Sequence, residues 1–340
     1  MKRICICGGG SLGHVIAGYL SAKKEVEVNI LTQRPQLWKH ELHISTPEGS
    51  TLHGKLSIIS DNPEEVLRGT DIVLLCLPGY AIKSELIKIK PYVNSHTFVG
   101  SVFSSTGFFF EALGLFDEDV PLWGFQRVPF IARTEVYGES AHLLGYKNSH
   151  NIAIERCNDK NTFRTIVEEL FDAPVHLLNN YYEASFTNSN PILHPSRLYT
   201  LFKDWNTEIY YEHQFLFYEE WTNDASELLI TLDNELFSIL AKLPVSPDYL
   251  MPILPYYESH DAESLTRKIR SISGFKGIVT PMIFTEQGWQ PDLSSRYFQE
   301  DFIYGLRYIH QEAHRLRLEV PMIDKVFDWG MKIMADRGAC

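Results

Sequence analysis

Short apolar runs alternate with stretches of helical periodicity through the first half of the chain. Runs of strand length occupy residues 3–7, 26–32, 71–77 and 97–103, and a helical pattern over 80–89 separates the last two. This alternation is typical of a parallel sheet with helices on both faces, and we predict such an α/β domain over residues 1–180. Further strands are expected at 142–145, 151–155 and 175–178, and a further helix at 161–171.

The second half of the chain has a different pattern. From residue 181 onward, long amphipathic stretches replace the strand-like runs, notably at 195–211, 213–243 and 301–316. Two segments rich in Pro, Gly and Ser, 244–255 and 271–295, are expected to be loops. We therefore predict an all-α second domain over residues 181–340.

A glycine-rich turn follows the first apolar run and precedes the first helical stretch. It reads Gly8, Gly9, Gly10, Ser11, Leu12, Gly13. In a dinucleotide-binding turn the first glycine allows the tight bend, the second lets a pyrophosphate approach the backbone, and the third lets helix and strand pack closely. The free N–H groups at the helix start then hold the pyrophosphate. We predict a Rossmann domain with Gly8, Gly10, Ser11, Leu12 and Gly13 at the cofactor, in preference to an ordinary glycine turn.

The end of the second predicted strand bears on which dinucleotide is bound. NAD-binding domains usually place Asp or Glu there to bind the ribose 2′-hydroxyl, whereas this chain has Gln33 and Arg34. A guanidinium pairs well with a 2′-phosphate, so NADP(H) is the preferred cofactor and NAD(H) the alternative. Arg34 could also be a solvated loop residue. Pro78, after the strand at 71–77, is expected at the carboxyl edge of the sheet, where ligands bind, unless it only ends that strand.

Composition restricts the function classes. The 340 residues carry a net charge of −12, which argues against a nucleic-acid partner because such a partner requires a basic face. No apolar run has the length of a membrane span, and we expect a cytoplasmic protein without a membrane partner. Among the five cysteines, Cys5, Cys7 and Cys76 fall within strand-like runs and are expected to be buried apolar residues. Cys5 and Cys7 are two residues apart and would face the same side of a strand, but no second Cys/His pair lies near enough in sequence to suggest zinc, so we predict no metal.

Two segments of the second domain are rich in residues that can do chemistry. In the first, His194 stands between Pro191 and Pro195, which restrict the backbone and indicate a helix start. An imidazole can exchange the proton that accompanies hydride transfer. In the second segment, Asp301 could orient that imidazole, and it could also be a helix N-cap or first-turn acid; the two roles are compatible. Arg296 could bind a substrate carboxylate or be solvated.

An aromatic segment over residues 210–221 is less informative. Its periodicity favours an amphipathic helix that buries Phe215, Phe217 and Trp221 in the core or in a subunit interface. A substrate-binding role is the weaker interpretation, and the segment does not identify a substrate.

Taken together, these motifs resemble the octopine/nopaline (opine) dehydrogenase family over most of the chain. The more specific part is the segment that contains Asn188, His194 and Pro195, followed by Arg296 and Asp301, which are five residues apart. The chain departs from the family in its shorter length, in Ser11 and Leu12 of the glycine turn, and in Gln33 and Arg34. The residues that carry the resemblance lie at 8–13, 28–32, 105–108, 128–133, 138, 145, 188–195, 296–297, 300–301 and 320–324.

The resemblance implies an NAD(P)H-dependent enzyme that condenses an α-keto acid with the amine of an amino acid and reduces the imine. It implies His194 as the catalytic acid/base, Asp301 as its partner and Arg296 as the carboxylate-binding group. Asn190 and Arg133 are further expected substrate contacts, and Arg127 is a secondary one. The implied second domain is of the 6-phosphogluconate dehydrogenase C-terminal type, and the resemblance is compatible with a homodimer.

Two alternatives remain open from the sequence. A ketopantoate-reductase-like or other hydroxyacid dehydrogenase would reduce a keto acid without an amine, using a lysine and an asparagine in the helical domain. Lys203 is the nearest such lysine, on a helix expected to expose it. The second alternative is a noncatalytic dinucleotide-binding protein, which the density of chemical residues in the second domain disfavours.

Overall fold

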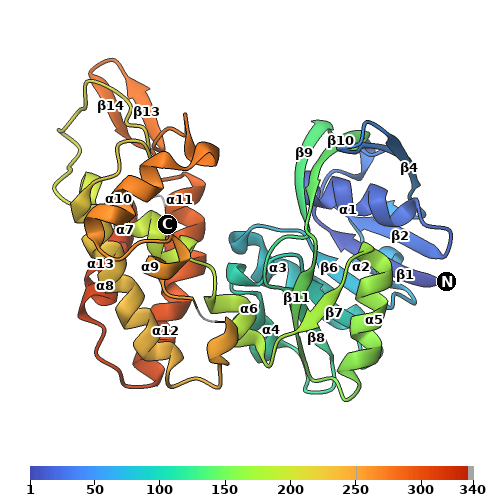
Figure 1. The fold of residues 1–340 in the computed structure, drawn as a ribbon. Coiled ribbons are helices and arrows are strands. Elements are labelled where there is room, and N and C mark those ends of the chain that lie inside the picture. Colours follow the sequence, from blue (N-terminus) through green and yellow to red (C-terminus); the bar gives the residue numbers. More distant parts are fainter. Residues whose placement is uncertain (250, 336–340) are drawn as a thin grey trace. The chain divides into compact units, whose positions relative to one another are not determined.

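The chain folds into two compact units in a computed structural model that describes residues 1–249 and 251–335 (Figure 1). Unit 1 comprises Met1–Ser185 and unit 2 begins at Phe186. Unit 1 is α/β and unit 2 is mainly helical, which confirms the predicted fold class.

The main sheet of unit 1 has eight strands in the order β12-β11-β8-β7-β6-β1-β2-β5. Its pairings are parallel except that β11 runs antiparallel to β8. Because β2 and β6 flank β1 on opposite sides, the chain reverses its direction of winding at β1. The strands are β1 (Lys2–Cys7), β2 (Val26–Leu31), β5 (Ile59–Ser60), β6 (Ile72–Leu75), β7 (Phe98–Ser101), β8 (Leu122–Phe125), β11 (His150–Glu155) and β12 (Val175–Leu177).

The helices of unit 1 connect these strands. The helices predicted at 80–89 and 161–171 are confirmed as α3 and α5, each one residue longer at its start. The α-helices are α1 (Ser11–Ser21), α2 (Pro63–Leu67), α3 (Gly79–Ile89), α4 (Phe108–Leu115) and α5 (Lys160–Phe171), with short 3-10 turns η1 (Pro35–Leu37), η2 (Lys90–Tyr92) and η3 (Ser104–Thr106). Helix α6 (Tyr181–Phe186) follows β12 and ends at the boundary with unit 2.

A second, four-stranded sheet in unit 1 was not predicted. The strand expected at 142–145 belongs to this sheet as β10 (Ser140–Tyr146), not to the main one, because it pairs with β3 (Glu41–Ser45) and β9 (Phe130–Val136). The order is β4-β3-β10-β9, with β4 at Thr51–Lys55. Helix α1 packs against this sheet as well as against the main one, and a β-carbon at Gly18 would lie 2.3 Å from Ile44.

Unit 2 packs its longer helices around a shared aromatic core. Phe298 and Phe302 stack with ring centroids 5.8 Å apart, and Trp329 lies beside both. The helices are α7 (Asn190–Phe202), α8 (Asn223–Leu240), α9 (Ile253–Tyr256), α10 (Ala262–Ser271), α11 (Arg296–Phe298), the π-helix η6 (Gln299–Leu306), α12 (Arg307–Arg315) and α13 (Pro321–Ala335), with 3-10 turns η4 (Pro247–Tyr249) and η5 (Ser273–Phe275).

Several predicted boundaries in unit 2 were wrong. In place of the helix expected at 195–211, α7 extends from Asn190 to Phe202. The helical stretch expected at 301–316 begins five residues earlier, at Arg296. The helix expected at 213–243 begins only after Thr222, whose side chain accepts a hydrogen bond from the N–H of Ala225. The loop expected at 271–295 contains a hairpin of β13 (Met282–Thr285) and β14 (Gly288–Pro291).

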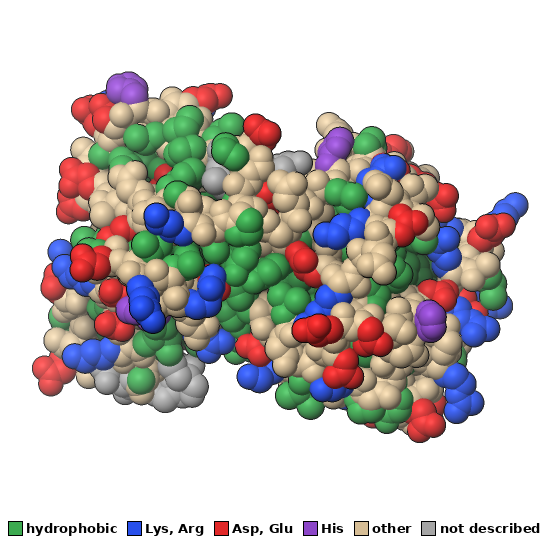
Figure 2. Space-filling view, turned by 90° about the horizontal axis from the view of Figure 1, so that it is seen from below, with side chains coloured by type: hydrophobic (Ala, Val, Ile, Leu, Met, Phe, Trp, Pro, Cys, Tyr) green, Lys and Arg blue, Asp and Glu red, His purple; other side chains and the backbone are tan. Residues whose placement is uncertain are grey.

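Charge is distributed rather than concentrated on the face drawn in Figure 2. There, acidic side chains are interspersed with lysine and arginine side chains, so the net charge of −12 does not form one acidic field on that face. Within the described part of the chain, none of the helices combines the length and the apolar character needed to cross a bilayer.

Candidate active site

The glycine turn of unit 1 has the close backbone approaches that its motif predicts. Gly8 has φ +116°, and a β-carbon there would lie 2.6 Å from the carbonyl oxygen of Cys76. A β-carbon at Gly13 would lie 2.2 Å from the carbonyl oxygen of Gly8, so α1 packs on β1 only with glycine at this position. Around Gly10, in contrast, there is open space within 4 Å. A pyrophosphate can therefore approach the backbone at Gly10 and the unpaired N–H groups that begin α1.

The other predicted cofactor residues lie around this turn in different ways. The Ser11 hydroxyl accepts a 3.0 Å hydrogen bond from the N–H of Thr134 on β9, so it ties the turn to the small sheet. Leu12 is half-buried against the core of unit 1. Pro78 precedes α3, just beyond the end of β6. The strand β2 ends beside the turn, and Arg34 follows it with an exposed side chain.

A histidine that the sequence analysis did not single out supports the turn from inside. His14 is fully buried in α1, and its Nδ1 lies 2.9 Å from the carbonyl oxygen of Gly10, to which it donates. Its Nε2 accepts a 2.6 Å hydrogen bond from the N–H of Gly138, and its ring stacks on Trp38. Burial lowers the pKa of His14, which keeps the imidazole neutral and able to accept at Nε2.

In unit 2, the structure brings His194 and Asp301 together. Nδ1 of His194, in the first turns of α7, lies 2.7 Å from Oδ2 of Asp301 in the π-helix η6. Both side chains are largely buried, with 8% and 14% of their surface exposed. An ionised carboxylate can only accept, so Nδ1 carries the proton and Nε2 of the neutral ring has a free lone pair. Asp301 also lies in the first turn of η6, so it is both the partner of the imidazole and an acid near a helix start, although the helical stretch itself begins earlier, at Arg296.

Two tyrosines complete the surroundings of this imidazole. The Tyr218 hydroxyl lies 2.8 Å from Nε2 of His194 and donates to it, and the ring of Tyr297 lies over the imidazole with centroids 4.3 Å apart. Burial first, and then the neighbouring Tyr297, raise the pKa of Tyr218 well above its usual range. Tyr218 therefore stays a neutral phenol that can donate, and both ring nitrogens of His194 are engaged.

The segment that carries Tyr218 is irregular rather than the predicted amphipathic helix. Arg197, three residues after His194 on α7, is buried and donates to the carbonyl oxygens of Phe217 at 3.1 Å and Glu220 at 2.7 Å. Because the guanidinium binds these two carbonyl oxygens, they are directed away from the hydrogen bonds that a helix would require. Burial lowers the pKa of Arg197 to about 10. No local sequence signal marks Tyr218 as a site residue, because only this tertiary contact directs it to the imidazole.

The remaining predicted substrate residues lie on other elements of the chain. Arg296 opens α11 with an exposed side chain, next to Tyr297 in the sequence. Asn190 opens α7 and is half-buried. Arg133 is exposed on β9 of unit 1, and Arg127 is half-buried in the same unit.

Chemically, unit 2 presents one oriented imidazole. A buried neutral ring with a fixed Nδ1 proton can take up a proton at Nε2 and return it, and the carboxylate stabilises the imidazolium formed in between. The Tyr218 hydroxyl lies where that proton must pass, so a substrate must displace this hydroxyl or exchange its proton through it.

Family models match both units of the chain. Residues 177–334 match the model described as NAD/NADP octopine/nopaline dehydrogenase, alpha-helical domain. Residues 4–103 match the model of ketopantoate reductase PanE/ApbA.

Individual relatives match over nearly the whole chain. Tauropine dehydrogenase of Arabella iricolor is 27% identical over 369 residues, covering 98% of this chain and 92% of that protein. Octopine dehydrogenase of Pecten maximus is 24% identical over 362 residues, covering 97% and 90%. Among solved structures, octopine dehydrogenase with NADH and L-arginine superimposes with a TM-score of 0.86 at 22% identity, covering 98% of this chain and 90% of that one. Yersinopine dehydrogenase with NADP+ gives a TM-score of 0.74 at 13% identity, covering 99% and 92%.

Proposed function

Because the chain belongs to the octopine/nopaline dehydrogenase family, we propose that it is an NAD(P)H-dependent enzyme that joins an α-keto acid to an amine. The amine and the keto acid lose water to form an imine, and reduction of the imine gives a secondary amine. The observation that carries the proposal is the buried His194–Asp301 pair, which offers one oriented proton-exchanging group in the helical unit.

The dinucleotide fits the glycine turn of unit 1. The open space at Gly10 and the close contacts that only glycine permits at Gly8 and Gly13 support a pyrophosphate at the start of α1. Ser11, Leu12 and Pro78 are the other proposed contacts. When bound, the reduced nicotinamide supplies the hydride that the imine carbon accepts.

The chain's own contribution is to hold and move a proton. We assign the acid/base role to His194, with the proton exchanged at Nε2 and Asp301 stabilising the charged ring through Nδ1. Arg296 is the proposed partner of a substrate carboxylate, which its exposed guanidinium could bind through two parallel hydrogen bonds. Asn190 and Arg133 are proposed as further substrate contacts, and Arg127 as a secondary one.

Substrate and cofactor class follow from the relatives as part of the same proposal. Solved structures of octopine dehydrogenase contain NADH with L-arginine, agmatine or pyruvate, so pyruvate and amino acids are the first substrates to test. NADP(H) is proposed ahead of NAD(H), since Arg34 follows β2 where an acidic residue would select NAD. A cytoplasmic location and a homodimer are further, separate proposals.

The direct test is consumption of NADPH and of NADH by the purified chain with a panel of α-keto acids, each with and without mixed amines. Oxidation that requires both substrates is expected. Oxidation with keto acid alone would instead establish a hydroxyacid dehydrogenase, the reaction suggested by the ketopantoate reductase match to residues 4–103. That match is confined to unit 1, and Lys203 is exposed at the end of α7, which favours the amine-dependent reaction.

The role of the imidazole is tested by His194→Ala. Turnover should fall by roughly 100-fold or more, because acid/base groups contribute on that scale, while the affinity for the dinucleotide stays unchanged. His260→Ala is the matched control, since His260 belongs to the same unit, also pairs with an aspartate and has an 80% exposed side chain. Loss of dinucleotide binding in His194→Ala would show that the residue is structural.

A further inference from the structure

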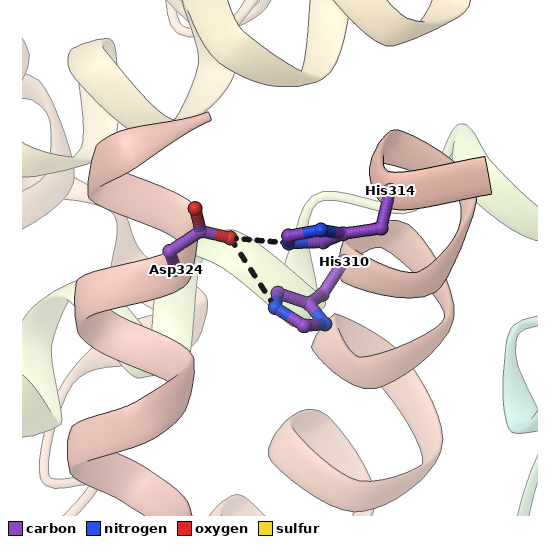
Figure 3. A group of neighbouring side chains, drawn as sticks. All are labelled: His310, His314 and Asp324. Atoms are coloured by element: carbon purple, nitrogen blue, oxygen red, sulfur yellow. Dashed lines mark hydrogen bonds and ion pairs between the residues drawn. The ribbon is translucent and has the colours of Figure 1, made fainter. Parts of the chain in front are cut away.

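Two histidines and an aspartate of unit 2 converge on one point away from the residues assigned above (Figure 3). His310 and His314 lie one turn apart on α12 and therefore share a face of that helix. Asp324 lies in the first turn of α13. Its Oδ1 is 3.2 Å from Nε2 of His310 and 2.9 Å from Nε2 of His314.

The spacing of these atoms suits a metal ion. The three potential ligand atoms lie within 4.8 Å of one another. Tetrahedral zinc with bonds of about 2.0 Å separates its ligand atoms by about 3.3 Å, so small side-chain movements would admit the ion. Two imidazoles and one carboxylate are also ligands that zinc and the neighbouring transition metals prefer.

Packing and hydrogen bonds hold the backbone around the three side chains in place. The His310 ring stacks on Phe327 of α13, with centroids 4.5 Å apart and planes 27° from parallel. The start of α13 is fixed by Glu235 of α8, whose carboxylate accepts from the N–H groups of Met322 at 2.9 Å and Ile323 at 2.7 Å. The backbones that carry the ligands are therefore held in place before an ion arrives, as a metal site requires.

The three side chains are also accessible to an ion. His310 is 21% exposed, Asp324 36% and His314 56%, so the cluster opens to solvent and leaves room for water as a further ligand. We propose that His310, His314 and Asp324 bind a divalent transition metal ion of the zinc class, which clamps α12 to α13.

The clamp has a structural consequence for the helix that carries Asp301. The segments α11, η6 and α12 follow one another without a break from Arg296 to Arg315. A metal bound by His310 and His314 would restrain this continuous helical stretch beyond Asp301, nine and thirteen residues along the chain. The expectation of no metal from the sequence rested on the absence of a second Cys/His pair near Cys5 and Cys7, and it did not consider His310 and His314 with a ligand from a separate helix.

The test is zinc titration of the untagged full-length chain after treatment with a chelator, followed by calorimetry and by the visible absorption of the cobalt(II) form. We expect one saturable zinc ion per chain and the absorption bands of a four-coordinate cobalt site. His314→Ala and Asp324→Asn should each weaken binding by at least about 10-fold and remove those bands. The rise of the unfolding temperature with zinc, roughly 5 °C at 100-fold excess over Kd, should be lost as well.

His53→Ala provides the matched control. His43 and His53 form another close histidine pair, on β3 and β4 of unit 1, with their Nδ1 atoms 3.1 Å apart. Zinc binding in His53→Ala should equal that of the parent chain. The proposal is overturned if the parent shows no saturable site, if His314→Ala and Asp324→Asn bind zinc as tightly as the parent, or if only His53→Ala loses it. Since His314 is mostly exposed, its variant is expected to fold, and the unfolding temperature in chelator checks this.

Discussion

Replacing Asp301 by asparagine isolates the charge that faces His194. Asparagine has the same shape, and its Oδ1 can still accept from Nδ1 at the 2.7 Å separation seen for the carboxylate. What is lost is the negative charge next to the ring when Nε2 takes up a proton. The variant therefore measures how much the carboxylate stabilises the imidazolium during turnover.

The magnitude follows from the geometry of the pair. A charge-assisted hydrogen bond exceeds a neutral one by about 1 kcal/mol, which sets the lower limit. Two unit charges about 4 Å apart at an effective dielectric constant of about 20 attract by about 4 kcal/mol, which sets the upper limit for a site this buried. At about 1.4 kcal/mol per factor of ten, kcat should fall by about 5- to 1000-fold.

The assay is the initial rate of NAD(P)H oxidation at saturating keto acid and amine, together with fluorescence titration of the dinucleotide. Asp301→Asn should lower kcat and leave the dinucleotide affinity unchanged. Asp233→Asn is the matched control, because it makes the same change at another buried carboxyl of unit 2 that has no contact with the imidazole. A kcat for Asp301→Asn within twofold of the parent enzyme, in a folded protein, would refute the assignment.

Three further predictions concern other buried groups. Tyr218→Phe removes the donor to Nε2 of His194 and should change kcat by about 10-fold or more with little effect on the unfolding temperature, measured by the same rate assay and by calorimetry. Burial raises the pKa of Asp233 to about 6, although one hydrogen bond from Ile253 acts in the opposite direction. The folded chain therefore loses stability as pH rises from about 4 to 6, because the buried carboxyl must then ionise. In urea unfolding, Asp233→Asn should have a free energy of unfolding up to about 3 kcal/mol above that of the parent at pH 8, but not at pH 4. Burial lowers the pKa of His150 to about 4, so the stability of unit 1 should fall by up to about 3 kcal/mol as pH drops from 6.5 to 4, and His150→Leu should flatten that slope.

Each of these predictions has a clear contrary outcome. Unchanged kcat in Tyr218→Phe would mean that the hydroxyl only fills space beside the ring. Equal effects of Asp233→Asn at pH 4 and pH 8 would mean that the carboxyl is not desolvated in the folded chain. If the free energy of unfolding of His150→Leu fell with decreasing pH as steeply as that of the parent, another group would be responsible for the acid sensitivity of unit 1.

Part of the site could be predicted from the sequence because the motifs that mark it depend on interactions between neighbouring segments. The glycine turn is such a signal: the positive φ of Gly8 and the backbone contact at Gly13 act between neighbouring segments, so the motif specifies strand, turn and helix together. The pairing of His194 with Asp301 was also anticipated, together with a place for Asp301 near a helix start, and both are present. The start of that helical stretch was misplaced, because helix starts depend on packing as well as on sequence.

Other parts of the site were decided only by tertiary structure. The segment that carries Tyr218 has helical periodicity, yet Arg197 binds two of its carbonyl oxygens and the helix does not form there. Likewise, residues 142–145 were predicted as a strand, but only pairing with β3 and β9 assigns them to the small sheet.

The sequence by itself determined the class of this protein: a dinucleotide turn in an α/β unit, followed by a helical unit with a candidate acid/base histidine. Periodicity, glycine spacing and proline positions suffice for that because they report interactions within a few residues. Tertiary structure decided what touches each ring nitrogen of His194 and which side chains of α12 and α13 meet at Asp324. Those contacts join residues far apart in the chain, and their geometry depends on how the helices pack, which no local pattern records.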